Sequence, residues 1–266
     1  MPNAIITTTN YAGNGTQAGF LNAISSAMLI AGFSLLDSYV SSGNENRVWN
    51  FLDTTNGNAT FDNLILEAGF TAATTIRVRG FSSFDTATDT GSNVSTETPT
   101  ATIGLTNSFN IYSVAHPELR GVFVFAGGST ILSIFYLRPN PGLLINSASV
   151  NGWWNRNSAP LAFIPRVNFS NFTSLQTISS LRPGSVGTTC SITAIAATNP
   201  ASANFNTRFQ YPATIDTGSL QSSLAMSCDF CVAPASGMAF GDTLNNQFTF
   251  IEGLNTSQSR LFIKTT

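Results

Sequence analysis

The chain has 266 residues, enough for one large β domain or two smaller ones, and only 9% of them are Asp, Glu, Lys or Arg. A soluble protein usually has about 25% charged residues, so this chain has little of the ionic surface that keeps a monomer dispersed. The net charge of −2 argues against nucleic acid as a partner, and the hydrophobic fraction of 42% excludes a disordered tail.

The first predicted element is a helix near the start of the chain. The first 36 residues have no charged side chain. A signal peptide needs a positively charged start, and polar residues interrupt the apolar run over 20–36, so we expect neither a signal peptide nor a membrane span. Thr16 can cap a helix start and Gly32 can end the helix. We therefore expect one amphipathic helix of about four turns, packed on a sheet or on a neighbouring subunit. Its apolar stripe consists of Phe20, Ile24, Ala27, Met28 and Ala31.

Short segments of alternating polarity follow the helix and predict β-strands. Gly, Asn and Pro residues mark the turns between them, with residues 56–58 as a hairpin signal. In the fourth segment, Ile76 and Val78 share one face of the strand, while Arg77 and Arg79 share the other. The predicted strands are residues 33–39, 47–52, 61–70, 75–80, 109–114, 120–125, 131–137, 243–251 and 260–264.

The strand pattern predicts a mainly β fold, an antiparallel β-sandwich with one N-terminal α-helix. Residues 120–125 and 131–137 are nearly continuous apolar runs, so we expect them to be adjacent central strands buried on both faces. Residues 1–140 are predicted to form a helix plus a β-sandwich region. Residues 141–266 form a Pro/Asn-rich β region, either separate or part of the same domain.

The residues needed for nucleophilic or metal-dependent catalysis are scarce. His116 is the only histidine, a proline follows it, and no hydrolase motif is present, so a turn or core position explains it better. Three cysteines do not supply the four ligands of a structural zinc site. Glycoside hydrolysis needs two facing carboxylates, for which Asp37 with Glu45, or Asp85 with Asp89, are the available pairs. We predict a protein that is not an enzyme, with no catalytic residue, cofactor or metal.

Residues 82–99 read as a polar loop. Asp85, Asp89 and Glu97 lie in this loop and could hold a calcium ion through carboxylate oxygens. The spacing of a dedicated calcium loop is absent, and a solvated loop explains the same residues. The solvated loop is the favoured interpretation.

Aromatic and arginine side chains are the candidates for contacts with partners. The adjacent Trp153 and Trp154 point to opposite faces of an extended chain, so one of them is expected to be buried. The other could stack on a sugar ring or, as we favour, pack in the core or against a neighbouring subunit. Arg47, Arg77 and Arg79 suit fixed ion pairs because a guanidinium group is planar and rigid. The acidic residues near these arginines are Glu45, Asp62 and Glu67, and the interface candidates are Trp49, Arg77, Arg79, Arg120, Trp153 and Trp154.

Several short motifs give the chain a resemblance to a known group of proteins. In the first half they are GFSLLDSY at 32–39, NRVW at 46–49, FDNLILE at 61–67 and IRVRGFSSFD at 76–85, with a weaker set of GDT at 241–243, FTF at 248–250 and RLFIK at 260–264. With these motifs the chain resembles bacteriophage virion proteins encoded among tail and baseplate genes. The middle of the chain shows no such likeness.

The resemblance and the low charge together imply a non-enzymatic structural subunit of a phage tail, baseplate or neck. Such a subunit would assemble in the host cytoplasm and reside in the virion, bound to copies of itself and to other virion proteins, with no nucleic acid or membrane as partner. A capsid decoration (cement) protein is a variant of this hypothesis. The alternative is a glycan- or receptor-binding module of a tail fibre or adhesin, with a host surface glycan against Trp153 or Trp154. A polysaccharide-degrading enzyme is a third possibility, resting only on the presence of acidic residues.

Overall fold

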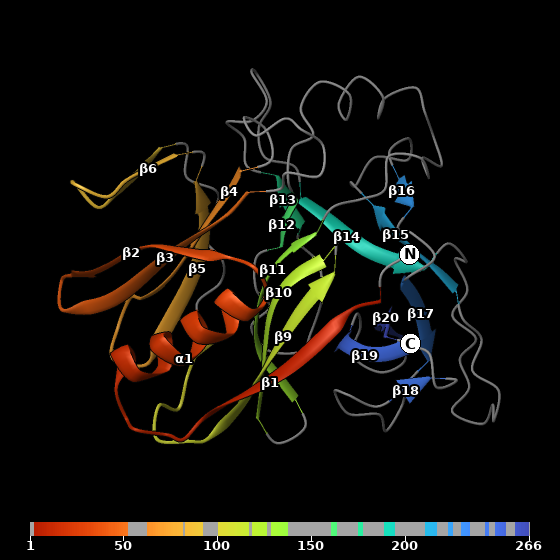
Figure 1. Cartoon of the computed structure of the whole chain (residues 1–266), viewed down its shortest axis with the longest axis horizontal. Coiled ribbons are helices and arrows are strands. Elements are labelled where there is room, and N and C mark those ends of the chain that lie inside the picture. The colour runs from red at the N-terminus through yellow and green to blue at the C-terminus, as the bar shows by residue number, and fades with distance from the viewer. Residues whose placement is uncertain are drawn as a thin grey trace.

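Antiparallel strands and one helix make up the part of the chain that the structure describes, which confirms the predicted fold class (Figure 1). The computed structural model describes residues 3–52, 63–81, 83–92, 101–116, 119–126 and 129–137, and beyond them the strands within 161–265 whose bounds are given below. The hairpin signal at residues 56–58 lies outside the described residues.

The elements follow one another in this order. They are β1 (Ile5–Tyr11), α1 (Gln17–Ile30), β2 (Ser34–Ser41), β3 (Asn44–Leu52), β4 (Asn63–Phe70), β5 (Thr75–Phe81), β6 (Ser83–Asp85), β7 (Thr90–Ser92), β8 (Ala101–Thr102), β9 (Phe109–His116), β10 (Leu119–Ala126) and β11 (Ser129–Leu137). The later strands are β12 (Leu161–Phe163), β13 (Leu175–Thr177), β14 (Thr189–Ala194), β15 (Tyr211–Asp216), β16 (Ser223–Ala225), β17 (Phe230–Pro234), β18 (Thr243–Leu244), β19 (Phe248–Gly253) and β20 (Ser259–Lys264).

The strands form two large sheets and one small hairpin. The long sheet has 13 strands in the order β1-β9-β10-β11-β12-β13-β14-β15-β17-β20-β19-β18, with β16 beside β15. The second sheet has five strands in the order β2-β3-β4-β5-β8, and β6 pairs with β7 alone. Because β11 pairs with β12, the long sheet continues across residue 140 into the Pro/Asn-rich region. The backbone N–H of Ala4 donates to the carbonyl of Lys264 at 2.9 Å, so the first strand also meets the last.

The core lies where the two sheets face each other, with α1 between them (Figure 1). The helix contacts β1, β9 and β10 of the long sheet and β2 and β3 of the five-stranded sheet. All five residues of the predicted apolar stripe are fully buried, and so is Leu21. Burying one such large side chain contributes about 2 kcal/mol, so α1 joins the two sheets through a shared apolar core. At 14 residues, this helix is too short to cross a membrane, and the described residues contain no other helix.

Both predicted ends of α1 are confirmed. At its start the Thr16 hydroxyl accepts a hydrogen bond from the N–H of Gly19 at 3.1 Å. At its end the N–H of Gly32 donates to the Leu29 carbonyl and that of Phe33 to the Met28 carbonyl, both at 3.0 Å. These two bonds form a Schellman motif, and its left-handed position is Gly32, with a φ of +97°. The chain therefore reverses in a tight turn and enters β2 directly.

The sequence-based element prediction was wrong at several places. The predicted strand 243–251 is divided into β18 and β19, and β8 was not predicted. Residues 82–99 do not form a loop throughout, because β6 and β7 pair as a hairpin within them. Strand β1 was missed because its sequence, IITTTNY, carries Thr and Asn on both faces, which blurs the alternation. It forms nonetheless because all seven of its residues pair with β9. The two apolar runs of the prediction are the adjacent strands β10 and β11, as expected.

Substitution of Gly32 tests the link between the helix end and the long sheet. Gly32 and Gly43 both have positive φ, at +97° and +77°, which costs an L residue about 1 kcal/mol. A Cβ at position 32 would also lie 2.7 Å from Nη1 of Arg120, whereas one at position 43 would meet nothing within 4 Å. We expect Gly32→Ala to lower the free energy of unfolding by roughly 1 kcal/mol more than Gly43→Ala, because Arg120 must leave its carbonyl acceptor. Denaturant unfolding measures both losses, and equal losses would contradict this link.

Candidate functional site

Four side chains gather on the outer face of the five-stranded sheet, and we call them the Glu67 cluster. They are Tyr39 from β2, Glu67 from β4, and Arg77 and Arg79 from β5. Glu67 pairs with Arg79 across the two strands, and successive side chains of a strand alternate between faces. Leu66, the neighbour of Glu67, belongs to the core, so the cluster lies on the side of the sheet away from α1.

The Glu67 carboxylate is fully buried and accepts hydrogen bonds from the other three members of the cluster. Arg79 donates from Nε to Oε1 at 2.8 Å and from Nη2 to Oε2 at 3.2 Å, which is a two-point contact. Arg77 Nη2 donates to Oε1 at 3.5 Å, and the Tyr39 hydroxyl donates to Oε2 at 2.6 Å. One carboxylate thus ties three strands together, and this is the structural role expected for Arg77 and Arg79.

The cluster shifts the titration of two of its members. Burial, followed by the hydrogen bond and the negative charge of Glu67, raises the pKa of Tyr39 to about 12. Burial acts to lower the pKa of Arg79, but the hydrogen bond and charge of Glu67 outweigh it, so the Arg79 pKa is raised. The tyrosine therefore stays neutral and the guanidinium stays charged over the whole range in which proteins function.

The β6–β7 hairpin covers part of this outer face. Phe84 of β6 packs on Phe81 with ring centroids 5.4 Å apart, and the Arg79 guanidinium lies 5.0 Å from the centre of the Phe81 ring. Gly91 of β7 lies so close to that ring that a Cβ would overlap it. With Val48 and Ile65, these aromatic rings make a small second core. The hairpin therefore closes over one side of the Glu67 cluster.

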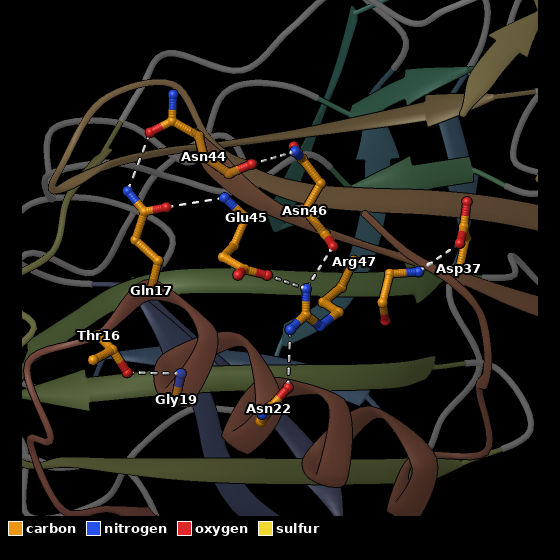
Figure 2. Close-up of polar contacts among 10 residues, drawn as sticks. Thr16, Gln17, Gly19, Asn22, Asp37, Asn44, Glu45, Asn46 and Arg47 are labelled. Carbon is orange, nitrogen blue, oxygen red and sulfur yellow. Dashed lines mark hydrogen bonds and ion pairs between the residues drawn. The ribbon is translucent and has the colours of Figure 1, made fainter. Parts of the chain in front are cut away.

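A second polar group joins α1 to the β2–β3 hairpin on the inner side of the sheet (Figure 2). The Gln17 amide donates to Asn44 Oδ1 at 3.2 Å and accepts from the backbone N–H of Glu45 at 2.9 Å. Arg47 donates from Nη1 to the Glu45 carboxylate at 2.8 Å and from Nη2 to Asn22 Oδ1 at 3.1 Å. These bonds fix the rotation of the helix on the sheet, and they include the expected ion pair between Arg47 and Glu45.

Arg120 of β10 lies at the other end of the helix. Its Nη1 donates to the carbonyl of Ala31 at 3.3 Å, and its guanidinium lies 5.2 Å from the centre of the Phe51 ring. The last carbonyls of a helix carry partial negative charge, so a cation there is stabilising. Arg120 thus connects the long sheet to the helix end and to β3.

The other interface candidates lie in different environments. Trp49 of β3 is fully buried in the core on the inner face of the sheet, so its ring is not on the surface of the subunit. Its neighbour Val48 faces outward, in the small second core. Trp153 and Trp154 lie outside the described residues. The structure therefore brings Arg77 and Arg79 together, and it places Trp49 and Arg120 apart from them.

The candidate acidic pairs are arranged for structural contacts. Asp37 and Glu45 point to opposite faces of the β2–β3 hairpin, since Asp37 pairs with the outward Val48 while Glu45 binds Arg47 on the inner side. They cannot flank one bond. Asp85 accepts from the N–H of Ala87 and the hydroxyl of Thr88, both at 2.9 Å, and these bonds lower its pKa.

The candidate calcium ligands do not form an ion-binding group among the described residues. Asp89, in the turn of the β6–β7 hairpin, has a pKa raised by desolvation and by the negative charge of Asp37. Glu97 lies outside the described residues. Within the part of the chain that is described, no group of three or more acidic, His or Cys side chains is placed to hold a metal ion. His116 is buried at the end of β9, in agreement with a core position.

One surface feature was missed by the sequence analysis. Six large apolar side chains are 36% to 67% exposed, and four of them flank the turn between α1 and β2. They are Ile5, Leu29, Ile30, Leu35, Leu36 and Val40. Leu29 and Ile30 lie outside the predicted apolar stripe of the helix. This position is the sequence signal from which their exposure could have been predicted.

No protein-family model matches the chain, and neither does any curated protein.

Removing the charge of Glu67 should be far more costly than removing that of Glu45. Glu67→Gln removes the buried negative charge that two partly buried guanidinium groups contact, so we expect it to lower the free energy of unfolding by about 3 kcal/mol. Glu45→Gln is the control, because the Glu45 side chain is 27% exposed and its pair with Arg47 should contribute about 0.5 kcal/mol. Urea unfolding of both variants measures the difference. Similar losses would show that the Glu67 cluster is not the stronger contact.

The raised pKa of Tyr39 predicts a loss of stability at high pH. The folded state favours the neutral phenol, so its contribution is complete below the unfolded-state pKa of about 10. It is lost as the pH rises from there through the folded-state value of about 12. Tyr39→Phe has no proton to lose and should show a smaller decline of the unfolding free energy over this range. An unchanged pH dependence in the variant would contradict the assignment.

Proposed function

We propose that this chain is a non-enzymatic structural subunit of a bacteriophage particle, located in its tail, baseplate or neck. It would act through protein–protein assembly, with copies of itself and with other virion proteins as partners. Assembly would take place in the host cytoplasm, and the finished subunit would reside in the virion. The observation that carries this proposal is an exposed apolar strip on a sheet edge, in a chain with only 9% charged residues.

The contacts that the charged side chains make within the fold support this proposal. Glu67 is enclosed by two arginines, Glu45 is paired with Arg47, and Arg120 caps a helix end. These charges hold strands and helix in place and leave little ionic surface for solvent. A surface of exposed Leu, Val, Ser, Thr and Asn suits permanent contact with other proteins better than free diffusion.

The motifs of the first half that carry the resemblance to virion proteins lie mostly in the five-stranded sheet, and their location also supports the proposal. The segments 32–39, 46–49, 61–67 and 76–85 include most of the β2–β5 part of the five-stranded sheet. They contribute all four members of the Glu67 cluster and the core residue Trp49. The residues that carry the resemblance to virion proteins are therefore framework residues. The resemblance carries no catalytic residue, which suits a subunit whose function is assembly.

The proposal predicts that the protein self-associates and is found in purified particles. The isolated chain should give a molar mass above that of the monomer by light scattering, and the mass should rise with concentration. Mass spectrometry of phage particles from the source of this sequence should detect the chain in fixed stoichiometry with tail or baseplate proteins. Detection in the head fraction would favour the cement variant. A chain that is absent from particles would refute the proposal.

A further inference from the structure

Strand β2 is an edge of the five-stranded sheet, with no further strand beside it among the residues that the structure describes. It comes first in the strand order and pairs only with β3 (Figure 1). It is eight residues long, and six of these residues are exposed. An edge strand of this length offers a row of backbone N–H and C=O groups to any further strand that can lie beside it.

One hydrogen bond shows which backbone groups of β2 face away from β3. The N–H of Ser38 donates to the carboxylate of its neighbour Asp37 at 2.7 Å (Figure 2). In an antiparallel pair the ladder bonds alternate, so the residues between the bonded ones direct their backbone groups outward. Ser38 and Val40 therefore direct their backbone groups away from β3. The Ser38 N–H is bound by Asp37, so the N–H of Val40 and the two outward carbonyls are the groups that can bind another strand.

Exposed apolar side chains lie along the same edge. Val40 is 59% exposed, Leu35 45% and Leu36 36%, and across the Schellman turn the helix adds Leu29 at 55% and Ile30 at 46%. A stable interface buries at least about 1,200 Å² in total, which one strand pair alone does not supply. The end of the helix extends the contact surface beyond the strand.

This edge lacks most of the devices that keep sheet edges apart. Such edges usually carry lysine, proline or an inward-pointing charge. Residues 29–43 contain neither lysine nor proline, and Asp37 is their only charged residue. A bulge between Leu35 and Asp37 interrupts the start of the strand. The stretch from Asp37 to Ser41 keeps a regular register with β3, and no described strand lies on its other side.

We infer that β2 is the surface through which two copies of this chain pair, with the two β2 strands antiparallel across a two-fold axis. The two five-stranded sheets would then form one continuous sheet. A second copy fits because an antiparallel strand pair is itself two-fold symmetric, so one edge is complementary to itself. The edge is almost uncharged, so it meets its own copy with little repulsion, whereas it offers nothing to attract a partner of opposite charge. This inference rests on the proposed function and names the surface that it uses.

Sedimentation analysis of the full-length chain over a range of concentrations tests this pairing. The wild-type chain should form dimers or larger assemblies built from dimers. Val40→Lys places a charge on the outward edge and should raise the dimer dissociation constant at least tenfold. Ile5→Lys is the matched control, because Ile5 is 67% exposed on β1, the edge of the other sheet, and its replacement should leave the dissociation constant unchanged.

A second variant distinguishes a weakened dimer from a chain that has failed to fold. Val40→Pro removes an outward N–H that does not belong to the β3 ladder, because Val40 lies two residues from Ser38 and has the same backbone orientation. It should therefore weaken the dimer as Val40→Lys does while the circular dichroism spectrum stays that of the wild type. Three results would overturn the inference: a wild-type monomer at every concentration, a dimer that neither β2 variant weakens, or a dimer that Ile5→Lys weakens equally.

The proposed function has a separate readout, the presence of the chain in purified particles. A monomeric chain that is nevertheless found there would overturn the pairing of β2 with its own copy and leave the structural role in place. Cross-links from β2 to a different virion protein would do the same, and would identify that protein as the occupant of the edge.

Discussion

The placement of α1 between two sheets is the constraint on which the rest of this structure depends. The helix has apolar residues on most of its surface, and the long sheet and the five-stranded sheet each bury part of it. Thr16 begins the helix and Gly32 ends it. Polar contacts at Gln17 and at Arg120 then fix the two ends against different sheets. The distance and angle between the sheets are thus set by one element of 14 residues.

The described arginines of this protein form contacts that hold its own strands and helix together. Each described arginine before residue 137 contacts an acceptor within the chain: Arg47 at Glu45, Arg77 and Arg79 at Glu67, and Arg120 at a helix carbonyl. Guanidinium groups suit this use because they remain charged when partly buried and can bind two acceptors at once. The low charge content and the architecture are therefore related, because these arginines contribute to the rigidity of the fold.

The sequence predicted the fold class well because the strongest periodic signals came from the best-buried elements. The stripe of α1, the strand with Ile76 and Val78 inward, and the paired runs of β10 and β11 all have a clear period. The ion pairs of the arginines also followed from short sequence distances. Strand β1 and the β6–β7 hairpin failed because edge and surface strands have polar residues on both faces, so their pairing depends on partners that lie far away in the chain.

The candidate site could be predicted only in part. The alternation of a strand tells which residues share a face, but it does not tell which face is buried. Trp49 and Arg47 share the inner face of β3, while Arg77 and Arg79 share the outer face of β5. A tryptophan expected at an interface therefore lies in the core. The exposed edge of β2 could not be foreseen either, because the order of strands in a sheet is set by tertiary contacts and not by local pattern.

The contact between Arg120 and the end of α1 has a consequence for natural variation. The guanidinium occupies the space beside Gly32, so positions 88 residues apart in the sequence share one small volume. A larger residue at position 32 displaces the Arg120 guanidinium from the Ala31 carbonyl, so it favours a different side chain at position 120. Homologues of this chain should therefore vary at these two positions together, and an alignment of them would display the pair as a covarying couple.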